Sequence, residues 1–170
     1  ALLGHENYSY RLQYNYGMKT NEIVSGTYEY SNFVSISSMD SYTREYKKEG
    51  YFARLNYDFD DKYYVTASYR RDGSSRFSKD NRWGNFWSFG ASWRISQEDF
   101  MENLTWVDNL KLRASYGETG NDAIYYTDDD TQQDYYPYQT LYNLGINNGL
   151  EAGLYFPTMA NNNLKWETQV

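Results

Sequence analysis

The stretch that decides the fold is Tyr51–Arg70, which reads YFARLNYDFDDKYYVTASYR. Aromatic and aliphatic residues alternate with mostly polar residues up to Phe59, and the alternation resumes at Tyr63. A period of two predicts β-strands whose two faces meet different surroundings. Asp60-Asp61 separates the two runs, and short acidic side chains favour a tight turn. The stretch therefore predicts an antiparallel β-hairpin.

The same alternation continues on both sides of this hairpin. The predicted strands cover residues 8–16, 51–59, 63–70, 86–96, 110–116 and 164–170. Long connections are predicted at 17–48, 71–85 and 117–163, with a possible ribbon over 27–36 and a helical turn near 99–104. Long connections alternate with shorter ones, as in up-and-down antiparallel strands with long loops on one side and short turns on the other.

Composition excludes several classes of function. Among the 170 residues there is no Cys and only one His, His5, which we interpret as incidental. A thiolate or multi-His metal site and a Ser-His-Asp triad are therefore not expected, and no other nucleophile–base pair is found. We predict no enzyme activity, catalytic residue, metal or cofactor. The net charge of -7 argues against a nucleic-acid partner, because phosphate contacts need clustered Lys and Arg.

The chain has no apolar run long enough for a membrane-spanning helix, but a membrane barrel has strands that are only half apolar. Both ends resemble strands that have been cut, which predicts a piece of a larger protein. The chain is 20% aromatic, with 21 Tyr. Tyr and Trp near strand ends would suit the girdles at a membrane interface: Tyr8, Tyr16, Tyr57, Tyr69, Trp87 and Tyr116.

The strands place their basic residues on the polar face: Arg11, Arg54, Arg70, Arg94, Lys111 and Arg113. A lipid-facing Arg or Lys near the bilayer midplane costs about 2–4 kcal/mol. In a membrane barrel the polar face must therefore line the lumen, and the Tyr/Leu/Ala/Trp face must meet lipid. The alternative is a soluble β-sandwich or barrel with the aromatic face inside, where every buried hydroxyl needs a partner. Periodicity alone leaves both open.

Ordered blocks of sequence carry a more specific signal. They are YFARLNYDF at 51–59, DKYY at 61–64, ASYRRDGSSRF at 67–77, WG at 83–84, FWS at 86–88, GASWRI at 90–95, LKLRASYG at 110–117, TGN at 119–121 and NLKWE at 163–167. In this order they resemble the barrel of SusC/RagA-type TonB-dependent outer-membrane transporters. The connections 17–48 and 122–160 match only loosely, and an Asn replaces a usual proline within Asn161–Asn163.

The resemblance implies an all-β fold, an antiparallel up-and-down transmembrane β-barrel of 22 strands. This chain would supply about six of those strands, as a partial barrel (1–170) without the plug or TonB box. The family imports oligosaccharides or oligopeptides across the outer membrane of Gram-negative, Bacteroidota-like bacteria. Its partners are a SusD-like surface lipoprotein and the TonB–ExbB–ExbD complex, which supplies energy. The alternative function is a soluble or surface-attached β-rich carbohydrate-binding module.

Two groups of residues are candidates for function. Loop aromatics form a predicted stacking surface for a sugar or peptide: Tyr125, Tyr126, Tyr135, Tyr136 and Tyr138. Lumen-facing polar residues are expected to pair with one another or with the plug: Arg54, Asn56, Ser68, Arg94 and Arg113.

Two further segments are interpreted as structural. We expect Arg70–Arg76 to form a loop network in which Gly73 permits a turn. The acidic run Asp128–Asp130, with Asp134, lacks the spacing of a calcium loop and is interpreted as solvated.

Overall fold

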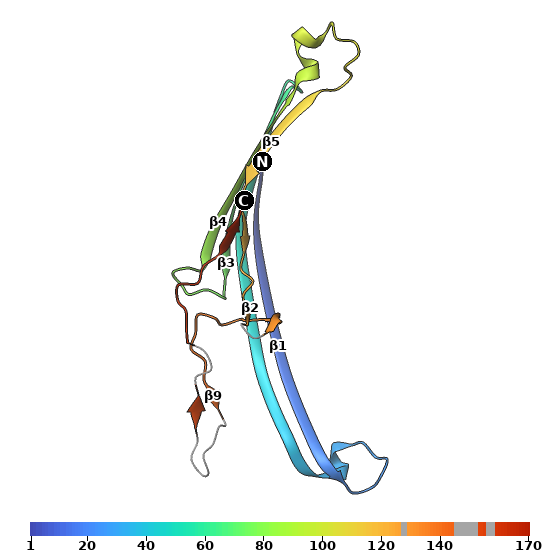
Figure 1. The fold of residues 1–170 in the computed structure, drawn as a ribbon, viewed down its shortest axis with the longest axis vertical. Helices are drawn as coiled ribbons and strands as arrows, with labels where there is room; N and C mark the ends of the chain where they lie inside the picture. The colour runs from blue at the N-terminus through green and yellow to red at the C-terminus, as the bar shows by residue number, and fades with distance from the viewer. Residues whose placement is uncertain (127–128, 145–152, 156–158) are drawn as a thin grey trace. The chain divides into compact units, whose positions relative to one another are not determined.

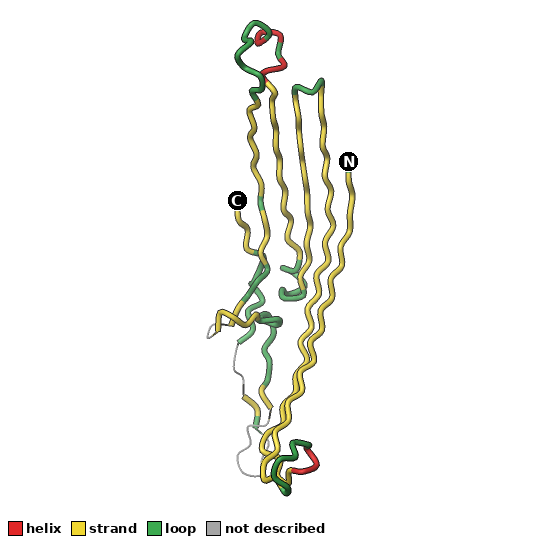
Figure 2. The backbone as a smooth tube through the Cα atoms, turned by 90° about the vertical axis from the view of Figure 1, so that its right-hand side faces the viewer, coloured by secondary structure: helices red, strands yellow, loops and turns green. Residues whose placement is uncertain are grey.

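A computed structural model describes residues 1–126, 129–144, 153–155 and 159–170. The chain divides into two compact units, residues 1–8 with 47–170, and residues 9–46. Five strands form the main sheet in the order β1-β2-β3-β4-β5 (Figures 1 and 2). Their bounds are β1 Leu2–Glu22, β2 Phe33–Phe59, β3 Tyr63–Ser74, β4 Trp83–Arg94 and β5 Lys111–Gly117.

Shorter elements complete the described chain. They are the 3₁₀ helices η1 Tyr30–Asn32, η2 Ile95–Gln97 and η3 Asp99–Met101, and the strands β6 Thr119–Asn121, β7 Tyr125–Tyr126, β8 Asp129–Gln133, β9 Asn143–Leu144, β10 Leu154–Tyr155 and β11 Glu167–Gln169. β11 pairs antiparallel with β6, which follows β5 almost directly. Among the described residues, no helix is long and apolar enough to cross a membrane.

The β2–β3 hairpin forms where the sequence predicts it. Asp60 and Asp61 have φ of 56° and 52°, and the Lys62 N–H donates to the Phe59 carbonyl at 3.1 Å. Two central residues with positive φ are typical of a type I′ turn, whose twist matches that of the flanking strands. The Asp58 carboxylate accepts a further bond from the Asp61 N–H at 3.2 Å. The turn fixes the register in which Tyr57 faces Val65 and Leu55 faces Ala67.

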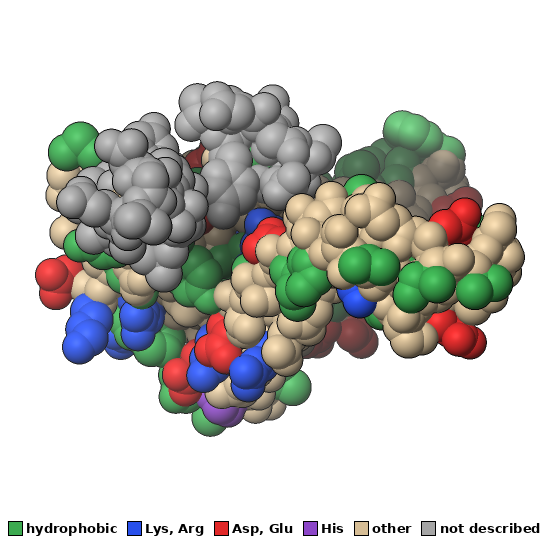
Figure 3. Space-filling model, turned by 90° about the horizontal axis from the view of Figure 1, so that it is seen from below, with side chains coloured by type: hydrophobic (Ala, Val, Ile, Leu, Met, Phe, Trp, Pro, Cys, Tyr) green, Lys and Arg blue, Asp and Glu red, His purple; other side chains and the backbone are tan. Residues whose placement is uncertain are grey.

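This register carries the alternation across four strands. One row runs from Leu55 through Ala67 and Phe89 to Tyr116, and the adjacent row from Asn56 through Thr66 and Gly90 to Ser115. We call the face of the Leu55 row the apolar face and that of the Asn56 row the polar face. Large hydrophobic side chains of the apolar face are exposed rather than enclosed. Figure 3 shows, in green, hydrophobic side chains exposed on the surface seen from below.

Residues 9–46 form a unit of their own, built from the rest of β1 and β2 and the connection between them. The connection is ordered by Asn32, which is buried and donates through Nδ2 to the carbonyls of Val24 and Thr27, both at 2.7 Å. The Tyr30 hydroxyl donates to the Gly17 carbonyl at 2.8 Å. This unit is therefore a two-stranded ribbon closed by a hydrogen-bonded loop.

Several predicted boundaries are wrong. The predicted loop 17–48 is mostly strand, because β1 continues to Glu22 and β2 starts at Phe33. A two-stranded ribbon exposes both faces, so its residues need not alternate and the pattern fades. The loop 71–85 shrinks to 75–82, and Gly73 lies inside β3 rather than in a turn, packed near Trp83. β4 ends at Arg94, two residues before the predicted end, and residues 117–163 include the short strands β6 to β10.

The compact core of the described residues is small and lies at the end of the sheet that carries the 75–82 loop, here called the loop end. Phe77, Phe86 and Trp166 are buried together, with Ile124 and Leu164 packed against them. The ring centroids of Phe77 and Phe86 lie 5.6 Å and 5.4 Å from that of Trp166. The Trp166 indole N–H donates to the Arg82 carbonyl at 2.9 Å. Packing of Phe86 requires glycine at two neighbouring positions, Gly84 and Gly120.

Gly120→Ala is expected to destabilise the folded state by about 1–3 kcal/mol, the usual cost of overpacking. A Cβ at Gly120 would lie 2.0 Å from Cζ of Phe86, far inside van der Waals contact. The measurement is the urea midpoint of the full-length protein in lipid vesicles. Gly26→Ala is a useful comparison, because Gly26 has open space around it but a φ of 87°, so any loss there reports backbone strain alone. An unchanged midpoint for Gly120→Ala would show that Phe86 does not pack as described.

Candidate functional site

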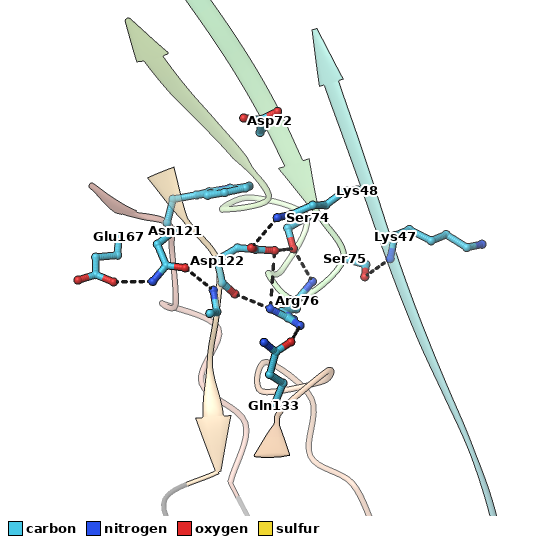
Figure 4. A network of polar contacts seen from close by, with 12 residues as sticks. Lys47, Lys48, Asp72, Ser74, Ser75, Arg76, Asn121, Asp122, Gln133 and Glu167 are labelled. Atoms are coloured by element: carbon cyan, nitrogen blue, oxygen red, sulfur yellow. Dashed lines mark hydrogen bonds and ion pairs between the residues drawn. The ribbon is translucent and has the colours of Figure 1, made fainter. Parts of the chain in front are cut away.

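A buried polar network joins three distant segments at the loop end, as Figure 4 shows. Asp122 lies at its centre, with a side chain only 7% exposed. Its carboxylate accepts from the Ser74 hydroxyl at 2.7 Å and lies 2.8 Å from the Lys48 ammonium. Arg76, whose side chain is 4% exposed, donates to the Asp122 carbonyl at 3.1 Å and to the Gln133 side chain.

The network forms where β3 ends, because Ser74 and Arg76 follow each other closely there in the sequence. Ser74 is the last residue of β3, and its hydroxyl both donates to Asp122 and accepts from the Arg76 N–H at 3.3 Å. The Asn121 amide donates to Glu167 at 3.0 Å, which joins β6 to β11 through side chains as well as backbone. Buried charges are tolerated only when paired and hydrogen-bonded, and this group satisfies both conditions.

Next to the network, the polar face is hollowed by a cavity of about 550 Å³. Its lining includes the glycines Gly50, Gly117 and Gly120 and the aromatic residues Phe86 and Trp166. Its polar side chains include Glu6, Arg70 and Asp72. Arg70 donates through Nε to Asp72 at 2.7 Å and through Nη2 to Glu6 at 3.0 Å. The cavity thus combines aromatic surface with charged side chains, of which four are acidic (Glu6, Glu49, Asp72 and Glu118) and two basic (Lys48 and Arg70), and this suits polar ligands or a polar protein surface.

A second cluster lies at the opposite end of the sheet, the turn end, where the β2–β3 turn meets the β4–β5 connector (residues 95–110). Glu98 is its centre, with a side chain 15% exposed. Its Oε1 accepts from the Tyr63 hydroxyl at 2.6 Å and from the Trp93 indole N–H at 2.7 Å. The Lys62 ammonium lies 3.6–3.9 Å from the carboxylates of Asp99, Glu98 and Asp60. The hydrogen bonds from Tyr63 and Trp93, followed by the charge of Lys62, lower the pKa of Glu98.

Because its pKa is lowered on folding, Glu98 stabilises the fold above its ordinary pKa of 4.5, and that contribution disappears as the pH falls through the lower folded value. We expect Glu98→Gln to be less stable than the parent at neutral pH, with the difference shrinking below about pH 4. The free energy of unfolding of the variant and of the parent, both as full-length proteins in vesicles between about pH 3 and pH 7, measures this difference. Asp108→Asn, an exposed position of the same connector, is the control and should leave the pH profile unchanged. A stability difference that stays constant with pH would contradict this role of the carboxylate.

Comparison with known proteins identifies the fold. Residues 2–169 match the family model described as TonB dependent receptor-like, beta-barrel. The chain belongs to the TonB-dependent receptor β-barrel family. It is 40% identical over 125 residues to the TonB-dependent receptor SusC of Bacteroides thetaiotaomicron, and 42% identical over 123 residues to TonB-dependent receptor P26 of Formosa agariphila. Each alignment covers 69% of this chain but only 12% and 11% of the relative.

Solved structures agree with this assignment. The chain is similar to a chain of the RagAB peptide transporter, with a TM-score of 0.83 and 30% identity. A second RagAB structure, of the peptide importer in its "closed-closed" state, matches with a TM-score of 0.82 and 29% identity. In both cases the match covers 98% of this chain and 18% of the other. The fold is thus that of a segment of a TonB-dependent receptor barrel, and the family is one of receptors and transporters.

The predicted lumen residues all lie on the polar face of this receptor sheet. Arg54 faces Ser68, Arg94 faces Lys111 and Arg113 faces Ser92 across neighbouring strands. The Ser68 and Ser88 hydroxyls share a hydrogen bond of 2.6 Å. Within the described chain, neither Arg54, Arg94 nor Arg113 lies within 4 Å of a carboxylate. Their pairing with a plug stays a prediction.

The predicted aromatic surface is only partly brought together. Tyr135 lies under the Arg76 guanidinium, 5.3 Å from ring centroid to Cζ, and so packs against the buried network. Tyr138 accepts from the Gln139 amide at 2.7 Å, and the Tyr136 N–H donates to Asp134 at 2.9 Å. Tyr125 is half-exposed, whereas the side chain of Tyr126 lies outside the described residues. Contact with a substrate stays a prediction.

The acidic run falls largely outside the description: Asp128 and the side chains of Asp129 and Asp130 are not among the described residues. Among those that are, no three His, Cys, Asp or Glu residues are placed to hold a metal. The predicted pairing of Arg and Asp in the 70–76 segment is present between Arg70 and Asp72, but the segment up to Ser74 is strand β3 rather than a loop. Sequence reasoning missed Asp122 and Glu98, because the alternation that marks strands says nothing about which loop carboxylate becomes buried.

Proposed function

We propose that this chain is part of the wall of an outer-membrane transporter that imports oligosaccharides or oligopeptides with energy from TonB. The chain spans about a tenth of the length of the curated relatives that it matches, so the activity belongs to the whole protein. A protein named SusC and a peptide transporter are among its relatives. Both substrate classes fit a polar cavity lined by aromatic rings and fixed charges.

The observation that carries the proposal is the separation of the two faces over four aligned strands. On the apolar face, aromatic side chains gather toward both ends: Tyr51, Tyr69 and Trp87 toward the loop end, and Phe59, Tyr63 and Trp93 toward the turn end. The residues between them are mostly aliphatic, with Tyr57 and Phe89 as exceptions. Tyr51 and Phe59 are separated by about 26 Å along β2 at about 3.3 Å per residue. Barrel strands tilt by about 35–45°, so this spacing corresponds to about 18–21 Å along the membrane normal, most of the apolar band of about 25 Å that aromatic girdles flank in an outer-membrane barrel.

The alternative, a soluble carbohydrate-binding module, would use the aromatic face as its core. The observed face is instead exposed: Leu55, Tyr57 and Phe89 are each about half or more accessible. A soluble domain would not leave so large an apolar surface in water. We therefore propose that the apolar face meets outer-membrane lipid, and that the polar face lines the lumen.

The proposal extends to partners. A SusD-like surface lipoprotein would close the loop side, and TonB–ExbB–ExbD would act through segments outside this chain. The test is uptake of a labelled oligosaccharide and oligopeptide panel by the parent cells, by cells without the full-length protein, and by cells without TonB. Loss of the same substrates in both mutants supports the proposal. Uptake that survives both deletions for every substrate contradicts it.

Tyr125→Ala in the full-length protein is expected to raise the Kd for the transported substrate about 2- to 10-fold. An aromatic contact contributes about 0.5–1.5 kcal/mol beyond area burial, and Tyr125 is half-exposed in the loop region. Isothermal titration with the substrate that the uptake panel identifies measures the change. Tyr28→Ala, in the separate 9–46 unit, is the matched control for loss of an exposed ring. Equal affinities for Tyr125→Ala and the parent would remove Tyr125 from the site.

A further inference from the structure

We propose that the β4–β5 connector, residues 95–110, is a membrane-surface anchor, with Phe100 and Trp106 placed at the boundary between lipid headgroups and acyl chains. The inference rests on the proposed function, because it requires the apolar face to meet lipid. The segment joins β4 to β5 and lies outside both strands. Three features of the connector support it: where it docks, what it exposes and what charge it carries.

The connector docks on the apolar face rather than under the polar face. Glu98 is held by the Tyr63 hydroxyl and the Trp93 indole N–H, and both of these residues belong to the apolar face. The Phe100 ring lies edge-on to Trp93, with centroids 6.5 Å apart, and Trp93 in turn stacks with Tyr63 at 6.5 Å. The aromatic row at the turn end thus continues without a break from the strands into the connector.

The connector is compact, which gives its exposed rings a defined position. Successive backbone bonds close turns from Glu98 to Ile95, Met101 to Glu98, Leu104 to Met101 and Val107 to Leu104, at 2.9–3.1 Å. The Ser96 N–H donates to the Leu110 carbonyl at 3.2 Å and closes the base of the segment. A loop built in this way presents Phe100, which is 63% exposed, and Trp106, which is 80% exposed.

The charge of the connector decides between two kinds of lipid contact. Residues 95–110 contain four acidic residues, Glu98, Asp99, Glu102 and Asp108, and no Lys or Arg. Attraction to anionic headgroups would need basic residues, so the contact must depend on the rings. Trp is favoured at the interface because its ring is apolar and its N–H stays hydrated. The occupant is therefore a lipid surface engaged by aromatic insertion, with the carboxylates left in water.

Site-directed spin labelling tests the placement. In the full-length protein without other reactive cysteines, a nitroxide is attached at Trp106→Cys, and in separate samples at Phe100→Cys, Glu102→Cys and Phe89→Cys. Each sample is reconstituted in phosphatidylethanolamine–phosphatidylglycerol vesicles, and collision with oxygen is compared with collision with a water-soluble nickel chelate. We expect the oxygen-to-nickel ratio to be highest at Phe89, several-fold lower at Phe100 and Trp106, and lowest at Glu102.

The four sites separate failure of the anchor from failure of the proposed function. A lipid signal at Phe89 with fully aqueous signals at both Phe100 and Trp106 overturns the anchor alone. An aqueous signal at Phe89 overturns the proposed lipid contact of the apolar face and the anchor with it. Protection of both connector sites from oxygen and nickel together indicates burial against protein, which also overturns the anchor. Two connector sites are used so that one misfolded variant does not decide the result.

Discussion

Leu55→Arg is expected to destabilise the inserted protein by about 2–4 kcal/mol, the cost of a lipid-facing Arg near the midplane of a barrel. Leu55 lies on the apolar face, midway between Tyr51 and Phe59 on β2, and is 53% exposed. Its row continues through Ala67 and Phe89 to Tyr116, and that row contains no carboxylate with which the new charge could pair. The measurement is the urea midpoint of the full-length protein folded into vesicles, together with the yield of folded protein in the outer membrane.

The neighbouring position supplies the control. Asn56 is one residue along the same strand, so its depth is nearly the same, but it belongs to the polar face opposite Thr66. Asn56→Arg should change stability by no more than about 0.5 kcal/mol, as for an ordinary surface position. The account depends on the difference between the two variants. Equal losses of stability at both positions, or a larger loss at Asn56, would contradict the proposal that the apolar face is the one that meets lipid.

Asp122→Ala is expected to cost about 3–5 kcal/mol, because truncating one member of a buried ion pair leaves the other charge uncompensated. The Arg76 guanidinium, whose side chain is 4% exposed, loses a carboxylate oxygen 3.9 Å away but keeps its bond to the Asp122 carbonyl, while Ser74 loses its acceptor at 2.7 Å. Lys48 is 41% exposed and can turn to water, so it adds little to the loss. Thermal loss of the compact, heat-modifiable form on gel electrophoresis measures the effect in the full-length protein.

Asp80→Ala is the matched variant. Asp80 is an exposed carboxylate in the 75–82 loop, so its removal should leave the transition unchanged within about 0.5 kcal/mol. A second comparison separates charge from shape: Asp122→Asn keeps an acceptor for Ser74 and should lose less than Asp122→Ala. An Asp122→Ala protein that loses its compact form at the same temperature as the parent would contradict the stabilising role of this network.

Much of the sheet could be predicted from the sequence because its physical cause is local. The alternation from Tyr51 to Arg70 reports one buried or lipid-facing side and one polar side, and Asp60-Asp61 tolerates the positive φ that the turn requires. The predicted strands 51–59 and 63–70 therefore lie wholly inside β2 and β3. The predicted sixth strand does not join the main sheet of five strands: β11 pairs instead with β6, in a separate two-stranded sheet.

What escaped prediction depends on contacts between residues far apart in the chain. Asp122 is 48 positions from Ser74, and nothing near it distinguishes it from a solvated loop carboxylate. Glu98 looked like one of several acidic residues in a connector, and only the register of Trp93 with Tyr63 reveals its two donors. Within the unit formed by residues 9–46, the strand was predicted to end at residue 16 and a ribbon only over 27–36, because the polar residues beyond Tyr16 and Ile36 interrupt the alternation although β1 and β2 continue.

The most direct test of the central claim is where the native full-length protein resides and what accompanies it. Membranes of the source cells are fractionated, the outer membrane is extracted in mild detergent, and proteins that co-purify are identified by mass spectrometry. The account predicts recovery from the outer membrane as a heat-modifiable species together with a SusD-like surface lipoprotein. Recovery as a soluble protein of about 20 kDa, the mass of this chain alone, would contradict it and make the aromatic face a protein core.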